Sequence, residues 1–385
     1  MASGAGKQET CDVSSLAMPG VRGLQPYLPG KPVSELEREL GLSNIIKLAS
    51  NENPLGCSPA ARAAIKNALP DLALYPDGSG YALRQTLARH HGVDADCVTL
   101  GNGSNDLLVL LAEAFLGPER NAVYAQYAFA VYALAVQATG APAKVARALP
   151  ADAEQALGHD LEAMLGLVDE NTRIVFIANP NNPTGTWLKD ADLAGFLDAL
   201  PGHVLALVDE AYFEYARELD VPDASQWLGK YPNLVVTRTF SKVFGLAGLR
   251  IGYSLSDPAV ADMLNRIRQP FNVNSLAMCA AKAALEDKVF IHQAVTTNSA
   301  GMRQLHQGLK ALGLPAAASA GNFLLVEFKG RARAVYQYLL EHGLIVRPLG
   351  NYGLGDHLRI TVGTPAQNAR LLEILGGMPD HATAV

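Results

Sequence analysis

The sequence has little of what marks membrane-bound, secreted or nucleic-acid-binding proteins. Its most apolar helical stretch, residues 107–116, is interrupted by Glu113 and is far shorter than the roughly 18 residues that cross a bilayer. The stretch from Met1 to about Gly20 is small and polar, where a secretory signal would have a basic region and an apolar run. Basic residues number 31 against 37 acidic ones and form no run that would neutralise nucleic-acid phosphates. We therefore expect a cytoplasmic protein that binds neither a membrane nor a nucleic acid.

Paired cysteines are also missing. Cys11, Cys57, Cys97 and Cys279 are scattered without a CxxC spacing. Such a distribution indicates neither a zinc site nor a disulfide framework, so we expect no bound metal. Only 18% of the residues are charged and 49% are hydrophobic, and there is no internal repeat or low-complexity tract. This composition excludes an intrinsically disordered chain and favours a globular one.

The length of 385 residues exceeds what one ordinary hydrophobic core holds and predicts two unequal domains. We expect a large domain over residues 45–285 and a smaller α+β domain over residues 286–385. A flexible tail over residues 1–23 and a segment over residues 24–44, packing near the small domain, are expected to precede them.

The large domain is predicted to be α/β. Short runs rich in β-branched residues recur, each followed by turn residues and a helical pattern, which indicates parallel strands in βαβ units. Their continuous apolar character predicts a mostly parallel sheet covered by helices on both faces. The expected strands are Val98–Leu100, Asn121–Tyr124, Arg173–Ile177, Val204–Val208 and Leu234–Thr237, and those of the small domain are Phe323–Glu327, Ile345–Arg347 and Leu358–Val362. Ligands bind beyond the carboxyl ends of such strands.

Two of these predicted strands end in reactive side chains. Asp209 follows one strand, and the next strand runs into Ser241 and Lys242, so we expect both ends to face one cleft. A lysine beside hydroxyls, a carboxylate and an arginine can form a Schiff base with an aldehyde cofactor. A carboxylate about 4 Å from a pyridine nitrogen attracts its proton by roughly 4 kcal/mol, or some three pKa units. We predict that Lys242 carries the cofactor and that Asp209 keeps its ring nitrogen protonated.

A glycine-rich run between a predicted strand and a helix offers an anion site. The backbone amides of residues 101–105, with Ser104 and Asn105 at the helix start, suit a phosphate. Arg250, Ser241 and Thr239 supply further charge and hydroxyls. Residue 106 is aspartate and no acidic ribose partner is evident, so a nucleotide-binding dehydrogenase is the less favoured alternative.

The run NPNNPTG, residues 179–185, predicts a rigid turn because two prolines and a glycine restrict it. Such a turn can aim the Asn182 amide at the cofactor's phenolate oxygen, with the Tyr212 hydroxyl as a second donor. Tyr127 follows another strand and is expected to lay its ring against the pyridine face.

Taken together, NPNNPTG, DEAY (209–212) and SKVFGLAGLR (241–250) resemble the fold-type I, class I/II aminotransferases, which use pyridoxal 5'-phosphate. QPY (25–27), LASNENPLG (48–56), YPDG (75–78) and LRITVGT (358–364) are similar to the histidinol-phosphate aminotransferase family. The resemblance covers nearly the whole chain from about Leu24. It implies an aspartate-aminotransferase-like fold.

The resemblance also implies roles for individual residues. The expected cofactor-binding residues are Ser104, Asn105, Tyr127, Asn182, Asp209, Tyr212, Thr239, Ser241, Lys242 and Arg250. Tyr75 would reach the cofactor phosphate of a neighbouring subunit, which implies a homodimer with composite sites. Tyr27, Asn322, Arg347 and Arg359 would face the substrate.

The implied reaction, in histidine biosynthesis, converts histidinol phosphate and 2-oxoglutarate into imidazole-acetol phosphate and glutamate by a ping-pong Schiff-base mechanism. Aromatic amino acid aminotransferase activity is the closest alternative, because an imidazole pocket can admit a phenyl ring. Threonine-phosphate decarboxylase activity is less favoured, and a pyridoxal-binding regulator would require an appended DNA-binding region that the sequence lacks.

Overall fold

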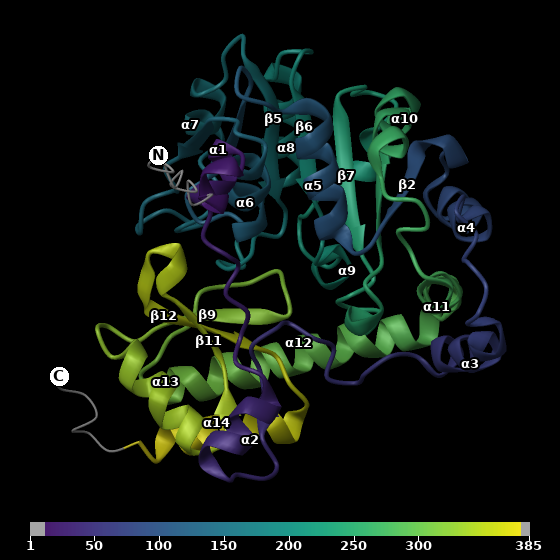
Figure 1. The fold of residues 1–385 in the computed structure, drawn as a ribbon. Helices are drawn as coiled ribbons and strands as arrows, with labels where there is room; N and C mark the ends of the chain where they lie inside the picture. The colour runs from purple at the N-terminus through teal and green to yellow at the C-terminus, as the bar shows by residue number, and fades with distance from the viewer. Residues whose placement is uncertain (1–11, 379–385) are drawn as a thin grey trace, which may run out of the picture.

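The structure, a computed structural model, describes residues 12–378. Its centre is a seven-stranded sheet in the order β2-β8-β7-β6-β5-β3-β4 (Figure 1). The strands are β2 (Val98–Gly101), β3 (Asn121–Ala125), β4 (Ala143–Ala146), β5 (Thr172–Ala178), β6 (Leu205–Asp209), β7 (Leu234–Thr239) and β8 (Gly252–Ser256). Neighbouring strands are parallel except that β8 is antiparallel to both β7 and β2. The predicted α/β class with a mostly parallel sheet is confirmed.

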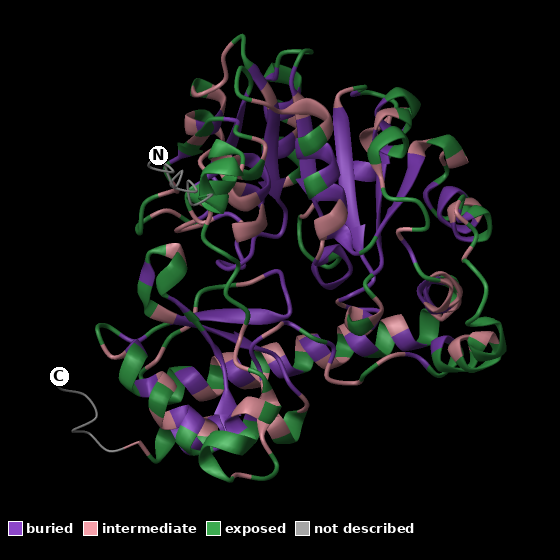
Figure 2. Ribbon diagram, in the orientation of Figure 1, coloured by how far each residue is buried: buried purple, intermediate pink, exposed green. Residues whose placement is uncertain are grey.

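Every residue of β2, β3, β7 and β8 is buried, which requires cover on both faces of the sheet (Figure 2). One covering helix, α5, packs across β5, β7 and β8. The helices of this part are α3 (Pro59–Ala68), α4 (Tyr81–His91), α5 (Ser104–Phe115), α6 (Ala130–Ala138), α7 (Leu161–Gly166), α8 (Asp190–Ala199), α9 (Phe213–Ala216), α10 (Pro258–Ile267) and α11 (Ser275–Glu286).

The predicted strands of the sheet are present, but the sequence analysis missed β4 and β8. β4 is a half-exposed edge strand, and β8 carries serines and a glycine among its apolar residues, so neither has the expected apolar run. The β2 strand was expected among parallel neighbours, yet its only ladder in the described sheet is the antiparallel one with β8. Because β8 reverses direction between β7 and β2, β2 still runs the same way as β7. The carboxyl ends of both strands therefore lie at one edge.

The second core lies around a three-stranded antiparallel sheet in the order β11-β12-β9. Its strands are β9 (Phe323–Glu327), β11 (Arg347–Leu349) and β12 (Leu354–Thr361), and its helices are α12 (Lys288–Ala311), α13 (Ala332–Glu341) and α14 (Pro365–Gly376). In α12, Ala294 packs in the hydrophobic core around the seven-stranded sheet, the large core, while Leu305 and Leu309 pack in the core around the three-stranded sheet, the small core. This helix therefore joins the two cores (Figure 1).

The start of the large domain needs a correction. We predicted that it begins at residue 45, but β1 (Ile46–Lys47) pairs with β10 (Leu344–Ile345). Leu48 is buried in the small core. The chain therefore adds a strand to the small part before it enters the large one. The remaining domain limits stay a prediction.

The N-terminal segment is more regular than expected. Residues 1–11 of the predicted flexible tail lie outside the described residues, but residues 13–22 form η1 (Val13–Leu16) and α1 (Pro19–Arg22). A Cβ on Gly20 would collide with the Gln137 carbonyl oxygen at the end of α6, so this turn packs closely on the large part. Further along, α2 (Val33–Leu40) buries Leu36 against Leu340 and Ile345 of the small part.

Short 3₁₀ turns complete the fold: η2 (Leu69–Asp71), η3 (Ala95–Cys97), η4 (Ala224–Trp227), η5 (Ala247–Leu249) and η6 (Gly350–Tyr352). Among residues 12–378, no helix has both the length and the apolarity that a bilayer crossing demands.

Candidate active site

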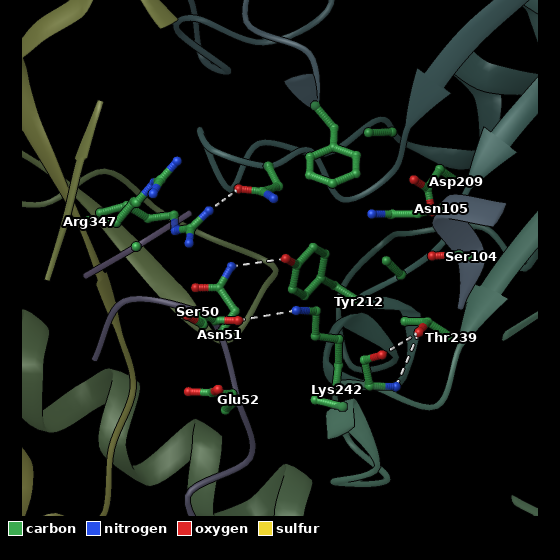
Figure 3. A pocket seen from close by; sticks show the side chains of 18 of the residues that line it. Ser50, Asn51, Glu52, Ser104, Asn105, Asp209, Tyr212, Thr239, Lys242 and Arg347 are labelled. Atoms are coloured by element: carbon green, nitrogen blue, oxygen red, sulfur yellow. Dashed lines mark hydrogen bonds between the residues drawn. The ribbon is translucent and has the colours of Figure 1, made fainter. Parts of the chain in front are cut away.

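A cavity of about 240 Å³ lies where the carboxyl ends of the large sheet meet β11 and β12 (Figure 3). It brings together most of the predicted site residues, from elements far apart in the sequence. Those that line it are Tyr27, Ser104, Asn105, Asn182, Asp209, Tyr212, Thr239, Ser241, Lys242, Arg250, Arg347 and Arg359.

Lys242 follows β7 and projects into this cavity. Its Nζ donates a hydrogen bond of 3.3 Å to the Ser50 carbonyl oxygen and lies 5.6 Å from the centre of the Tyr212 ring. Burial, reinforced by the positive charge of Arg359, lowers the pKa of the Lys242 amine from 10.5 to about 8. A substantial fraction of neutral amine therefore exists close to neutral pH, as a nucleophilic lysine requires.

Asp209 ends β6, and its two carboxylate oxygens have different surroundings. The Tyr132 hydroxyl donates to Oδ2 at 2.9 Å, whereas Oδ1 is buried and has no hydrogen-bond partner among the described residues. Burial raises the pKa of Asp209 to about 6, although the Tyr132 hydrogen bond opposes the rise. Because buried polar atoms are normally hydrogen-bonded, we expect this carboxylate oxygen to accept a hydrogen bond from a ligand in the cavity.

The predicted anion site has the backbone shape that phosphate binding needs. Gly103 is the N-cap of the twelve-residue helix α5 and has a φ of 86°. A Cβ there would collide with the Arg250 guanidinium, so only glycine lets the arginine approach the helix N-terminus. The Arg250 Nη1 reaches Ser241 Oγ at 3.4 Å, and Thr239 donates to the same oxygen at 3.0 Å. Amides, hydroxyls and one guanidinium therefore converge on one corner of the cavity.

Asn182 and Arg359 form a direct link across the cavity. The Arg359 Nη1 donates to Asn182 Oδ1, and Nη2 donates to the Ala49 carbonyl oxygen at 2.6 Å. A guanidinium only donates, so the Asn182 oxygen faces the arginine and its NH₂ group faces elsewhere. This orientation leaves the Asn182 NH₂ group free of the arginine, which the predicted hydrogen bond to a phenolate oxygen requires.

The two predicted substrate arginines are direct partners in one ladder. Arg347 of β11 lies opposite Arg359 of β12, and directly opposed residues of antiparallel strands project from the same face. Both are buried, and neither forms an ion pair with any described residue. Arg347 donates to the Leu28 carbonyl oxygen at 2.6 Å and lies 5.6 Å from the Tyr27 ring centre. Like charges facing each other are unfavourable unless an anion lies between them.

Tyr127 is not where the sequence analysis expected it. Its side chain packs with Leu325, Leu349 and Leu354 outside the cavity, while Phe129 lines the cavity instead. The turn after β3 decides this, because a displacement of two residues within an irregular turn changes which ring faces inward. Phe129 is therefore the better candidate for stacking on a ring in the cavity.

Two further predicted residues also lie outside the lining. Tyr75 is 84% exposed and stacks on Phe271 with ring centres 4.8 Å apart. Asn322 is buried, and its Nδ2 donates to the Asn51 carbonyl oxygen at 3.0 Å. It supports the backbone of the cavity wall and does not face the cavity itself.

The sequence analysis missed several lining residues on the segment after β1. Ser50, Asn51 and Glu52 line the cavity together with Phe129. They belong to the stretch LASNENPLG, which we used only for its family resemblance. The richness of that stretch in polar residues right after a short strand was the available signal. No three histidine, cysteine or acidic side chains cluster as metal ligands within residues 12–378.

Comparisons with known proteins agree with this geometry. Residues 43–375 match the family model of class I and II aminotransferases. Histidinol-phosphate aminotransferase 2 of Pseudomonas fluorescens is 56% identical over 366 residues, covering 94% of this chain and 97% of the relative. The corresponding protein of Methylococcus capsulatus is 56% identical over 352 residues, covering 91% and 95%.

A solved structure is similar as well. The histidinol-phosphate aminotransferase of Sinorhizobium meliloti, in complex with pyridoxal-5'-phosphate, matches with a TM-score of 0.84 and 29% identity, covering 93% of this chain and 96% of that one. The fold is accordingly fold type I. The chain belongs to the class I and II aminotransferases, and within them to the histidinol-phosphate aminotransferase family.

Proposed function

We propose that this protein transfers an amino group from histidinol phosphate to 2-oxoglutarate, giving imidazole-acetol phosphate and glutamate, with pyridoxal 5'-phosphate as its cofactor. The observation that carries the proposal is the pair Arg347 and Arg359, two buried guanidiniums opposite each other without an ion-pair partner among the described residues. They lie in the same cavity as Lys242 and Asp209.

The cavity residues fit pyridoxal phosphate on three independent features. Asp209 Oδ1 is buried and accepts no hydrogen bond from residues 12–378, and a protonated pyridine nitrogen would supply one. At the corner around Gly103 and Arg250, the missing Cβ of Gly103 lets the guanidinium approach the N-terminus of α5, and both offer donors for a phosphate. Lys242 has a half-buried amine whose pKa is lowered to about 8. We propose that Ser104, Asn105, Thr239, Ser241 and Arg250 hold the phosphate.

When bound, pyridoxal phosphate carries the amino group between substrates and accepts electrons from the substrate carbon. The protein's own residues supply proton transfer and orientation. The neutral Lys242 amine can take the proton that leaves the amino-bearing carbon and return it. Asn182 and Tyr212 are placed to donate hydrogen bonds to an anionic oxygen, and Phe129 to cover a ring face.

Recognition of the two substrates follows from the arginine pair. Histidinol phosphate has a phosphate and no carboxylate, whereas glutamate has two carboxylates, and guanidinium groups pair with either anion. Because both arginines are buried, an anion between them is largely withdrawn from water. Loss of one guanidinium is expected to cost roughly 2–4 kcal/mol.

We also propose a homodimer in which Tyr75 of one subunit reaches the phosphate corner of the other, that is, the corner of the cavity around Gly103 and Arg250. Tyr75 is 84% exposed, and Leu72 and Leu74 beside it are exposed as well. Several large apolar side chains exposed on one short segment favour burial against a second copy. The phosphate corner remains open at Arg250, which is itself exposed.

Specificity constants for three amino donors, measured side by side, test the proposal. Histidinol phosphate should exceed phenylalanine and tyrosine by at least about 100-fold, because only it places a dianion between the arginines. Equal or higher values for phenylalanine and tyrosine would overturn the substrate assignment in favour of an aromatic amino acid aminotransferase.

A further inference from the structure

Asn51 has an unusual conformation for a residue in the cavity wall. It is only 1% exposed and has a φ of 55°, in the left-handed region that residues other than glycine rarely adopt. Its side chain points to Tyr212 (Figure 3). Asn51 lines the same cavity as Lys242. A buried asparagine held in the left-handed conformation at such a place suggests a functional role for its side-chain amide.

The hydrogen bonds around Asn51 fix the orientation of that amide. The Asn51 backbone N–H donates to Thr361 Oγ1 at 3.0 Å, and the Thr361 hydroxyl donates back to Asn51 Oδ1 at 2.9 Å. The Asn51 Nδ2 then donates to the Tyr212 oxygen at 2.9 Å. The reverse amide orientation would leave the buried Thr361 hydroxyl without an acceptor among the described residues.

This chain of bonds also constrains the hydroxyl hydrogen of Tyr212. Since the Tyr212 oxygen accepts from Asn51, its own hydrogen points away from Asn51. Tyr212 is buried and lines the cavity together with Lys242 and Asn182. Burial raises the pKa of Tyr212 to about 12, so the hydroxyl keeps its hydrogen as a donor. The free direction for this hydrogen is the cavity.

Asn51 is itself held by the small part of the molecule. Thr361 belongs to β12, and Asn322, just before β9, donates to the Asn51 carbonyl oxygen at 3.0 Å. Three hydrogen bonds from two residues therefore fix both its backbone and its side chain. This explains how a strained backbone conformation persists at this position.

We infer that Asn51 is a positioning residue that turns the Tyr212 hydroxyl hydrogen into the cavity. The inference rests on the proposed function, in which that hydrogen is donated to the phenolate oxygen of pyridoxal phosphate. A donor stabilises an anionic oxygen, and a second donor behind it strengthens the first. Without Asn51 the Tyr212 hydroxyl is free to rotate, and its bond to the phenolate oxygen weakens.

The test is a pH titration of the visible absorbance of the bound cofactor in four proteins: the parent, Asn51→Gly, Tyr212→Phe and the double variant. Glycine accepts the positive φ and removes the Asn51 side chain while keeping the backbone bonds possible. An anionic oxygen that loses a donor holds its proton more tightly. The pH at the midpoint of the absorbance titration should therefore rise. We expect a rise of about one pH unit for Tyr212→Phe and roughly half of that for Asn51→Gly. The double variant should match Tyr212→Phe, because Asn51 acts through that hydroxyl.

The outcomes separate the two claims. A parental midpoint in Asn51→Gly, or a double variant whose shift is the sum of the two single shifts, would overturn the role of Asn51. A parental midpoint in Tyr212→Phe would overturn the proposed role of Tyr212 instead.

Asn51→Asp provides a second variant, since it keeps the size but gives Tyr212 an acceptor in place of a donor. It should raise the midpoint at least as far as Asn51→Gly. Asn368→Ala, which removes a buried amide of the small part away from the cavity, should destabilise the protein without moving the midpoint.

Discussion

The Tyr132 hydroxyl donates a hydrogen bond of 2.9 Å to Oδ2 of Asp209, the oxygen that does not need a ligand. Tyr132 is fully buried and stacks on Phe176 with ring centres 4.9 Å apart, so its hydroxyl has little freedom. Oδ2 of Asp209 therefore already accepts a hydrogen bond from within the protein. The other, Oδ1, is left as the acceptor that we propose for the pyridine nitrogen.

We predict that Tyr132→Phe weakens cofactor binding about ten-fold or more, because it removes a hydrogen bond to a charged acceptor. Fluorescence titration of the cofactor-free protein with pyridoxal phosphate measures this affinity. Tyr253→Phe is the matched control: its hydroxyl is also buried in the large part and bonds to His91 at 3.0 Å, away from the cavity. Equal losses in both variants would mean that Tyr132 acts only on stability.

For Asp209→Asn we predict opposite effects on activity and stability. Transamination should fall at least about 100-fold, since the neutral amide cannot hold the ring nitrogen protonated. Burial raises the pKa of Asp209 from 3.8 to about 6 in the folded protein. The stability that this group contributes is therefore complete below about pH 4 and is lost as the pH rises through 6.

The cofactor-free Asp209→Asn protein should consequently be more stable than the parent at pH 8, by roughly 1–3 kcal/mol, and should differ little at pH 4. Urea unfolding at both pH values checks this. A variant that is less stable than the parent at pH 8 would contradict the assigned burial cost.

A third prediction concerns the rate at which the cofactor-free protein takes up pyridoxal phosphate covalently. Only the neutral Lys242 amine reacts, and burial lowers its pKa to about 8. The rate constant should therefore rise with pH and reach half its maximum near pH 8. Stopped-flow absorbance gives the profile, and Lys242→Ala should show noncovalent binding alone and no steady transamination. A midpoint near 10.5 would show that the amine is solvated.

Arg347 and Arg359 should differ in their effects on phosphorylated and unphosphorylated donors. Arg359→Ala should impair the half-reactions with both glutamate and histidinol phosphate, by about thirty- to thousand-fold, and should also free Asn182 Oδ1 from its partner. Arg347→Ala should weaken histidinol phosphate more than phenylalanine. Single-turnover measurements with each donor decide this, and equal losses for all donors on changing Arg347 would refute phosphate recognition there.

The two rings after β3 give a matched pair of substitutions. Phe129→Leu should weaken pyridoxal phosphate binding by about three- to ten-fold, because a flat ring in the cavity wall is lost. Tyr127→Leu should leave that affinity unchanged, because Tyr127 packs with leucines outside the cavity. Equilibrium binding to the cofactor-free variants checks both. The reverse order would restore the sequence-based interpretation of Tyr127.

Local patterns were sufficient to predict the strands of the large sheet that contain an uninterrupted apolar run. β5, β6 and β7 are buried between helices, and such burial leaves a continuous apolar run in the sequence. β4 and β8 lack this signal, because an edge strand is exposed on one side and β8 includes polar residues. Because ligands bind beyond the carboxyl ends of parallel strands, Asp209 and Lys242 could then be predicted at one edge of the sheet without knowledge of the three-dimensional fold.

By itself, the sequence determined which reactive groups follow the apolar strands, and its motifs carried the family resemblance. Only the tertiary structure decided which ring faces the cavity, Phe129 or Tyr127, because an irregular turn has no periodicity to read. It also decided that Arg347 lies opposite Arg359 and that Thr361 holds Asn51. These relationships join residues up to 310 positions apart, and such contacts are fixed by strand register and domain packing, which no local stretch of sequence encodes.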